Sequence, residues 1–426
     1  MTSITRNISQ QSQLCGRMFK QVVLAASLVA LSGCAAVNTV TDWFADDDEI
    51  KIRRIAPIVN QVTPKVVWSH SVGDGVDGFF SRLQPVYANN TVFAAERHGE
   101  VVALEPGNGD VKWRRNFAIF RSDSIFDGIA NIWRSGTSAK ISAMAAGYDK
   151  VFVGSENGQL LALDSKTGET LWEASVPGEI LARPAMDEGI LVINTGAGVL
   201  FGFDAQTGEQ LWRSETDVPP LSLRGISAPA ASNGGTLIGT PTGKLQVNIL
   251  TTGVPAWETA ITAPSGATEL ERIIDVDSSP VLYGTTVYIV SYDGTLAALE
   301  LRSGRILWKR EYGSYRDLAV TSERIYVVDN RSNVFALDRR NGIEIWSQGG
   351  LRQRNLTAPL IMGEHVVLGD RWGLLHWLNT EDGTMAARYD LGGDDEDEAI
   401  YAAPIKVDDM IVTITRDGDI AALTTK

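Results

Sequence analysis

The ten residues from Leu163 to Trp172, LDSKTGETLW, decide the fold, because the same pattern recurs along most of the chain. Each copy places a Gly in a short turn, and in six copies a Trp follows four residues after that Gly. These six pairs are Gly109 and Trp113, Gly168 and Trp172, Gly208 and Trp212, Gly253 and Trp257, Gly304 and Trp308, and Gly342 and Trp346. Successive copies begin 38 to 59 residues apart. This spacing is typical of the four-stranded blades of a β-propeller.

Two further copies depart from the pattern. The seventh, residues 378–383, has Ala387 at the position of the Trp, and the eighth starts at Ala422 and runs out at Lys426. In the copy around Gly253, Ile249 replaces the acidic residue of the turn. We therefore expect eight blades, with local irregularity at Ala387 and Ile249.

Each repeat consists of short stretches of alternating apolar residues, separated by turn signals such as Asn157-Gly158. Because Gly adopts the positive φ that two-residue hairpins need, these stretches are interpreted as strands joined by tight turns. The eighth repeat holds only three strands, whereas residues 64–69, PKVVWS, form an unassigned strand that carries Trp68. Pairing the first strand with the last three leaves no free sheet edge at the seam. The sequence thus predicts an all-β, eight-bladed β-propeller of four-stranded blades over residues 64–426, closed by the N-terminal strand.

The composition is globular and acidic. Of 426 residues, 44% are hydrophobic and 21% are charged, and 38 Lys and Arg against 52 Asp and Glu give a net charge of −14. A chain with this balance has no basic surface for a polyanion, so we expect no nucleic-acid partner. The two Cys residues exclude a disulfide-stapled scaffold and a Cys-rich metal site.

The amino terminus has the features of an export signal. Arg17 and Lys20 precede an apolar run, residues 22–31, that is too short to span a bilayer but fits a secretory signal. The run leads into LSGC, which ends at Cys34 and resembles a bacterial lipobox. That resemblance implies cleavage after residue 33 and lipid attachment to Cys34, with Met18 as an alternative start. The competing interpretation is a buried free cysteine.

The stretch that follows, residues 34–63, shows no sustained period and contains the acidic run DDDE at 46–49. We interpret it as a flexible, lipidated tether. In lipoproteins of this kind an Asp just after the cysteine marks retention in the inner membrane, and here Ala35 and Ala36 follow instead. By that resemblance we expect an anchor in the outer membrane, on its periplasmic face.

We find no recognisable catalytic, metal or cofactor site in the sequence. Four histidines, His70, His98, His365 and His376, are scattered without the spacing of metal ligands. The acidic run DDEDE at 394–398 lacks the loop Gly of an EF-hand, so it is interpreted as a solvated loop. We therefore expect a protein that is not an enzyme and binds no cofactor.

Loops that break the repeat are the better candidates for function. One is the aromatic insertion at 114–142, which either packs locally or forms a partner surface. In two others, Arg224 and Asp275 each lie five residues before the Pro that opens a strand, so they occupy equivalent positions in consecutive blades. We expect them on one rim, with Asp277, Leu221 and Leu223 beside them. Such a cluster fits an interface hot spot, although an internal salt bridge with tucked leucines fits the same spacing.

The repeat A-x-D-x-x-T-G-x-x-x-W resembles the tryptophan-docking motif of quinoprotein dehydrogenases, and it covers residues 64–426. That family holds pyrroloquinoline quinone and calcium at the propeller axis, beside a vicinal disulfide. No Cys-Cys pair exists in this chain. A periplasmic quinoprotein-like dehydrogenase, or a ligand-binding propeller with a degenerate centre, is thus the alternative function.

A second resemblance is more specific. The loops LSLRG at 221–225 and DVDSSP at 275–280, together with the lipobox, the tether and the eight repeats, are similar to those of the propeller lipoproteins of the outer-membrane β-barrel assembly machinery. The resemblance implies that both loops dock onto the periplasmic POTRA domains of the barrel subunit BamA. Its implied contact residues are Leu221, Leu223, Arg224, Asp275 and Asp277. It implies a scaffold that assists insertion of β-barrel proteins, with unfolded clients as further partners through exposed outer strands.

Overall fold

The computed structural model describes residues 51–76, 78–79, 81–118, 138–219, 221, 225–264, 268, 273–392 and 398–425. The chain divides into two compact units, with the boundary between Ala56 and Pro57. In the first unit, residues 51–53 are helical. Within the described residues, no helix is both long enough and apolar enough to cross a membrane. The signal segment and Cys34 lie outside the described residues.

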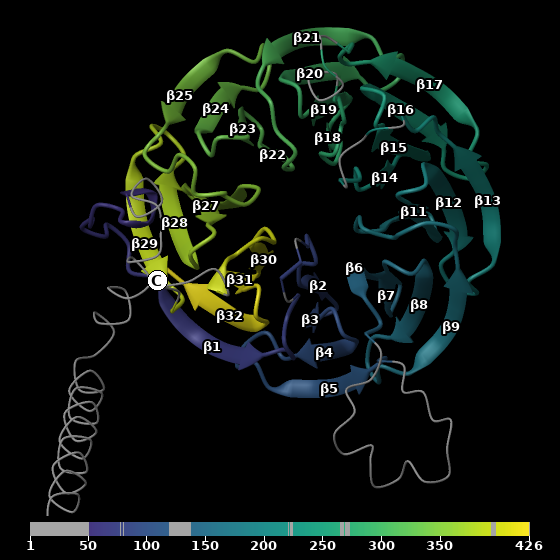
Figure 1. The fold of residues 1–426 in the computed structure, drawn as a ribbon, viewed down its shortest axis with the longest axis horizontal. Helices are drawn as coiled ribbons and strands as arrows, with labels where there is room; N and C mark the ends of the chain where they lie inside the picture. The colour runs from purple at the N-terminus through teal and green to yellow at the C-terminus, as the bar shows by residue number, and fades with distance from the viewer. Residues whose placement is uncertain are drawn as a thin grey trace, which may run out of the picture. The chain divides into compact units, whose positions relative to one another are not determined.

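The second unit consists of eight four-stranded antiparallel sheets, which form a ring around a central axis (Figure 1). In blades 1 to 4 the strands pair in chain order. Their bounds are, in blade 1, β2 (Val86–Ala88), β3 (Thr91–Ala95), β4 (Glu100–Leu104) and β5 (Val111–Asn116); in blade 2, β6 (Ile141–Gly147), β7 (Lys150–Ser155), β8 (Gln159–Asp164) and β9 (Thr170–Ser175); in blade 3, β10 (Ala185–Asp187), β11 (Ile190–Asn194), β12 (Val199–Asp204) and β13 (Gln210–Glu215); and in blade 4, β14 (Ala230–Ser232), β15 (Gly235–Gly239), β16 (Lys244–Ile249) and β17 (Pro255–Ala260).

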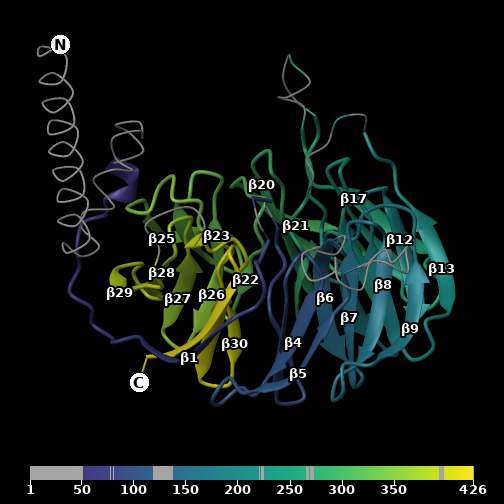
Figure 2. The ribbon, with the colours of Figure 1, turned by 60° about the horizontal axis from the view of Figure 1, so that its bottom comes forward.

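Blades 5 to 7 repeat this order, whereas blade 8 takes its outer strand from the other end of the chain. The bounds are, in blade 5, β18 (Val281–Tyr283), β19 (Thr286–Val290), β20 (Thr295–Glu300) and β21 (Ile306–Glu311); in blade 6, β22 (Ala319–Val320), β23 (Arg324–Val328), β24 (Val334–Asp338) and β25 (Glu344–Gln348); in blade 7, β26 (Leu360–Met362), β27 (His365–Gly369), β28 (Leu374–Asn379) and β29 (Met385–Asp390); and in blade 8, β30 (Ile405–Val407), β31 (Met410–Ile414), β32 (Asp419–Thr424) and β1 (Lys65–Ser71). Figure 2 shows the strands running between the two faces of the ring, so successive turns alternate between the faces.

The strand β1 closes the ring. It pairs antiparallel with β32, from Lys65 opposite Thr424 to Ser71 opposite Asp419, and Figure 1 shows the two strands side by side. The prediction of eight blades closed by the N-terminal strand is therefore confirmed. Closure satisfies the backbone edge of β32, which sequential packing alone would leave open.

The repeated turn between the third and fourth strands depends on its acid and its Gly. In blade 2, one carboxylate oxygen of Asp164 accepts hydrogen bonds from the backbone N–H groups of Lys166 and Thr167, both at 2.9 Å. These bonds stabilise the ionised form and lower the pKa of Asp164. Gly168 then takes φ 70°, a left-handed conformation that costs Gly little. The acid is a turn residue, as its recurrence in most blades indicates.

Each repeat Trp packs onto the turn Gly of the next blade. A Cβ added to Gly168 would lie 2.7 Å from the Trp113 ring, so only Gly leaves room for the indole. Six tryptophans also donate their indole N–H to a backbone oxygen of that neighbouring turn. The donor and acceptor residues are Trp68 and Pro106, Trp113 and Ser165, Trp172 and Ala205, Trp212 and Leu250, Trp257 and Leu301, and Trp346 and Thr380. The Trp residues thus join the blades.

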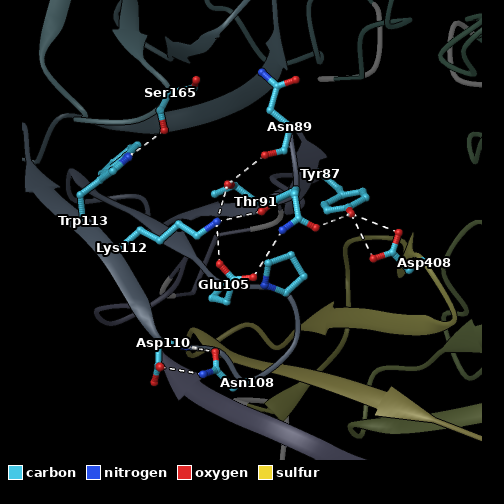
Figure 3. A network of polar contacts seen from close by, with 12 residues as sticks. Tyr87, Asn89, Thr91, Glu105, Asn108, Asp110, Lys112, Trp113, Ser165 and Asp408 are labelled. Atoms are coloured by element: carbon cyan, nitrogen blue, oxygen red, sulfur yellow. Dashed lines mark hydrogen bonds and ion pairs between the residues drawn. The ribbon is translucent and has the colours of Figure 1, made fainter.

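Figure 3 shows two contacts that hold blade 1 between its neighbours. On one side, the indole N–H of Trp113 points to the carbonyl oxygen of Ser165 in blade 2, at 2.9 Å. On the other side, the hydroxyl of Tyr87 lies 3.1 Å from both carboxylate oxygens of Asp408 in blade 8. The seam that closes the ring is therefore tied by polar contacts at its inner strands as well as by β1.

Blade 7 contains the missing Trp on a different strand. In the other blades the Trp lies on the fourth strand and faces a residue of the third strand that is Ala or Gly, as Ala336 faces Trp346 in blade 6, except in blade 4, where it is Val247. In blade 7 the pair is reversed, because Trp377 of β28 faces Ala387 of β29. Trp377 is fully buried and fills the space on the same side of the sheet. The expected irregularity at Ala387 is thus an exchange within one cross-strand pair.

The exchange follows from the way the ring closes. Blade 8 has no turn between its third and fourth strands, because β1 comes from the N-terminus. A Trp on β29 would therefore have no turn Gly and no turn carbonyl to contact in blade 8. Consistently, the indole nitrogen of Trp377 has no hydrogen-bond partner in the structure.

The segment before β1 covers this seam instead. The backbone N–H of Gln61 donates to the carbonyl oxygen of Ala386 at 2.7 Å, and the Asn60 side chain exchanges two hydrogen bonds with the backbone of Arg388. Val62 packs against the buried cluster shared by blades 7 and 8. The propeller unit therefore starts at Pro57, inside the stretch 34–63 interpreted as tether.

Candidate functional site

The two loops predicted to bind a partner precede the opening strands of blades 4 and 5. Leu221 is exposed, with 44% of its surface accessible, whereas Leu223 and Arg224 lie outside the described residues. Asp275 and Asp277 precede β18 and are buried, at 1% and 4% exposure. Leu221 is therefore accessible to a partner, whereas the side chains of Asp275 and Asp277 are shielded from solvent.

The aspartate segment is held between blades 4 and 5. The N–H of Val276 donates to the carbonyl oxygen of Thr240 in blade 4 at 3.3 Å. The carbonyl oxygen of Asp275 accepts from the N–H of Tyr292, in the turn between β19 and β20 of blade 5, at 3.0 Å. These bonds link the segment to both blades and set the position of the Asp277 side chain.

The two loops meet at Gly225 and Asp277. A Cβ added to Gly225 would lie 1.8 Å from one carboxylate oxygen of Asp277. Only Gly therefore allows the carboxyl group to lie against this backbone. The two loops therefore meet at Gly225, the residue that follows Arg224 in the sequence.

The cation that the structure places near Asp277 is Arg82, from the connection between β1 and β2. Its guanidinium donates to the carbonyl oxygens of Asp277, at 3.2 Å, and Tyr315, at 2.7 Å. Arg82 thus joins blade 1 to blades 5 and 6. Nothing in the sequence around Arg82 signals this contact, because its partner lies 195 residues away.

Asp277 has an unusual pKa. Burial raises it, the positive charge of Arg82 lowers it, and the nearby Asp275 raises it again, to a value of about 7. Desolvation disfavours the charged carboxylate more than Arg82 favours it, because the guanidinium of Arg82 donates to the carbonyl oxygens of Asp277 and Tyr315. The carboxyl group therefore changes charge near neutral pH.

Asp277 lies between two cavities. The first, which we call the rim pocket, is an open cavity of about 830 Å³ whose lining includes Glu179, Val218, Gly225, Ile226, Val276 and Asp277. The second, the axial cavity, is about 1050 Å³, and its lining includes Arg82, Leu181, Ile226, Asp277, Tyr292 and Tyr315. Both volumes are sufficient for a side chain or a small ligand.

The remaining residues singled out in the sequence play other parts. Within the described ranges, no group of His, Cys, Asp and Glu is arranged to hold a metal ion. His376 is fully buried, and one ring nitrogen lies 2.9 Å from a carboxylate oxygen of Asp370. Burial lowers the pKa of His376, so it is a neutral core residue. Most of the aromatic insertion (119–137) and of the acidic run (393–397) lies outside the described residues.

Comparison with known proteins assigns the family. A family model described as outer membrane protein assembly factor BamB matches residues 127–348. The chain is also 61% identical to the outer membrane protein assembly factor BamB of Alteromonas naphthalenivorans, over 96% of this chain and 98% of that relative. The chain belongs to the BamB family. The BamB of Escherichia coli K12 is 36% identical over 93% of this chain and 97% of its own length.

Solved structures agree on the propeller fold. The crystal structure of BamB from Moraxella catarrhalis has a TM-score of 0.72 at 23% identity and covers 85% of this chain and all of that one. A quinohemoprotein alcohol dehydrogenase from Comamonas testosteroni has a TM-score of 0.63 at 13% identity, covering 92% of this chain and 84% of that one. A dehydrogenase propeller model matches residues 59–180. The similarity to dehydrogenases therefore concerns the fold, whereas the BamB relatives are outer membrane protein assembly factors.

Proposed function

We propose that this chain is a lipid-anchored scaffold of the outer-membrane protein assembly complex, which binds the periplasmic POTRA domains of BamA. BamB relatives along nearly the whole chain support the role in outer-membrane protein assembly. The contact between Gly225 and Asp277 supports the docking site, because it brings the two candidate loops together. In this role the protein acts by position, since the anchor raises its effective concentration at the complex.

Among the proposed contact residues, Arg224 is the one whose substitution should cost the most binding free energy. Arg224→Ala is expected to weaken binding of purified BamA POTRA domains by about 2–4 kcal/mol, since hot-spot arginines contribute this much at interfaces. This corresponds to a roughly 30- to 1000-fold higher Kd, measured by isothermal titration calorimetry. The same variant should lose BamA in a pull-down from native membranes.

Two observations separate a lost contact from a lost fold. The far-ultraviolet circular dichroism and the melting temperature of Arg224→Ala should match those of the unaltered protein, because the substitution leaves the blades intact. Unchanged BamA retention by Arg224→Ala would remove this residue from the docking site.

Lipid attachment at Cys34 is the second element of the proposal. Cys34→Ala is expected to move the protein from the membrane fraction to the soluble periplasm, because without acyl chains the remaining attraction is the protein contact alone. Fractionation in cells carrying Arg224→Ala as well as Cys34→Ala tests the anchor without help from the partner. Membrane retention of that double variant would contradict the lipid anchor.

A further inference from the structure

A third cavity, which we call the inner cavity, lies at the centre of the ring. Residues just before or within the opening strand of every blade line it, so described residues surround the axis. Figure 1 shows opening strands such as β2, β18 and β22 nearest the axis. The inner cavity measures about 820 Å³ and shares Arg82, Leu181 and Tyr315 with the axial cavity. This volume is sufficient for a small ligand.

The lining of the inner cavity is positively charged, although the protein as a whole is acidic. Among the described residues, the charged side chains of the lining are those of Arg82, Arg183 and Arg316 against that of Asp317. The net charge of the chain is −14. The Asp317 carboxylate accepts the backbone N–H of Ser279 at 2.7 Å. Because a cavity lined mainly by one sign of charge attracts ligands of the opposite sign, this lining favours an anion.

Arg316 brings a buried charge to this cavity. It is 7% exposed, and its guanidinium donates to the side-chain oxygen of Asn355 at 2.6 Å and to the carbonyl oxygen of Asp329 at 3.4 Å. The Asp329 carboxylate instead accepts N–H groups of Arg331 and Asn333. Arg316 therefore forms no ion pair with the residues that the structure describes. A buried cation without a counter-ion is costly, and a bound anion would offset that cost.

Tyr315 holds a second cation beside Arg316. The guanidinium carbons of Arg82 and Arg316 lie 5.7 and 4.3 Å from the centroid of the Tyr315 ring, which is within the range of cation–π contacts. Arg82 donates to two backbone carbonyl oxygens. Burial lowers the pKa of Arg316, and the positive charge of Arg82 lowers it further. The two guanidinium groups thus repel each other, and an anion beside them would relieve that repulsion.

We propose that the inner cavity binds a small ligand that carries carboxylate or phosphate groups, and that Arg82 and Arg316 hold those groups. Each guanidinium has five N–H donors and uses only some of them on protein acceptors, so others remain for the oxygens of an anion. The Tyr315 ring and the carbonyl acceptors fix both side chains before the ligand arrives, which reduces the ordering cost of binding. This site contains none of the contact residues proposed for BamA, so it goes beyond the scaffold role.

The test is isothermal titration calorimetry of the full lipoprotein, in detergent, with inorganic phosphate and with citrate as probes. Chloride keeps the ionic strength constant in both titrations. Saturable binding of at least one probe to the unaltered protein is expected. Binding of citrate alone would assign a carboxylate ligand, whereas binding of phosphate alone would assign a phosphate ligand. Binding of both would support the shared oxyanion chemistry.

Two variants place the bound probe at the inner cavity. Arg82→Gln and Arg316→Gln each remove one positive charge and keep a long polar side chain. Each should raise the Kd of the probe about 10- to 100-fold, because hydrogen bonds to a charged group are lost. Arg302→Gln is the matched control, since Arg302 is exposed in the turn between β20 and β21 and does not line the inner cavity. Its Kd should equal that of the unaltered protein.

Melting temperatures separate a lost site from a lost fold. A saturating probe should raise the melting temperature of the unaltered protein and of Arg302→Gln, because a ligand of the native state stabilises it. The melting temperature of Arg82→Gln should not respond to the probe. A general effect of phosphate or citrate on stability would instead raise all three equally. Arg82 is only half-buried, so Arg82→Gln decides the test if Arg316→Gln does not fold.

Three results would overturn the inference. They are the absence of saturable binding of both probes to the unaltered protein, an unchanged Kd in Arg82→Gln, and an equal loss of binding in Arg302→Gln. Arg82 and Arg316 would then serve only to join neighbouring blades through their hydrogen bonds. None of these results depends on the POTRA domains, so the proposed scaffold role would stand in each case.

Discussion

Replacing Trp68 with alanine is expected to lower the free energy of unfolding by about 3–5 kcal/mol. Trp68 is 6% exposed, and its indole N–H donates to the carbonyl oxygen of Pro106 at 2.6 Å. Its ring also packs on Gly109. The substitution creates a cavity at the only seam where the strand completing the sheet is not joined to it by a hairpin. Denaturant unfolding followed by tryptophan fluorescence and circular dichroism measures the change.

Trp172→Ala is the matched control, because it removes the same side chain from a blade whose strands are all joined by hairpins. The Trp172 ring is half-buried and its hydrogen bond is longer, at 3.3 Å. We expect a smaller loss of stability for Trp172→Ala. Trp68→Ala alone should also form concentration-dependent oligomers in size-exclusion chromatography, since weakening β1 exposes the edge of β32. Equal behaviour of the two variants would argue against a special role of the closing seam.

Exchanging Trp377 and Ala387 is expected to be tolerated, although each single change is not. Trp377→Ala should cost about 3–5 kcal/mol, because it empties a fully buried site. Ala387→Trp should cost about 1–3 kcal/mol, since a second indole overpacks the same site. The double variant restores one indole to the cross-strand pair and should recover most of the loss. Unfolding free energies of the three variants give the coupling between the sites.

Blade 6 provides the control for this exchange. There, Ala336 faces Trp346, whose ring packs on Gly383 and whose N–H donates to Thr380 in blade 7. Exchanging Ala336 and Trp346 should leave the protein well below its original stability, because the contact between blades is lost. A blade 6 exchange as mild as that in blade 7 would refute the view that blade 7 lacks a docking turn to contact.

The repeated turn made the fold predictable from sequence. Gly and Trp at fixed spacing indicate both the hairpin and the neighbour against which it packs, so the number of blades follows from counting copies. The closing strand was predictable for a related reason, because a stretch with Trp68 but no hairpin partner matched a last repeat that lacked one strand. These inferences need only the local sequence pattern, so they can be made without knowledge of the tertiary structure.

Other features depend on contacts that no local pattern encodes. The exchange at Trp377 becomes visible only in the register of β28 and β29. Arg82 contacts Asp277 and Tyr315 across the ring, and the burial of Asp277 depends on two blades at once. The spacing from the opening prolines indicated that the two loops are neighbours, but it could not tell whether their aspartates face solvent or a cavity.

The pairing of β1 with β32 also means that the ring cannot close until the whole chain has been synthesised. Lys65 is made early and its partner Thr424 is among the final residues, so at translation rates of 5–20 residues per second roughly 20–70 seconds separate their appearance. During this interval β1 has no strand of its own chain with which to pair. A growing chain can therefore mispair through β1 with other chains until its carboxyl terminus has been made. A chain that is truncated before β32 keeps β1 unpaired permanently.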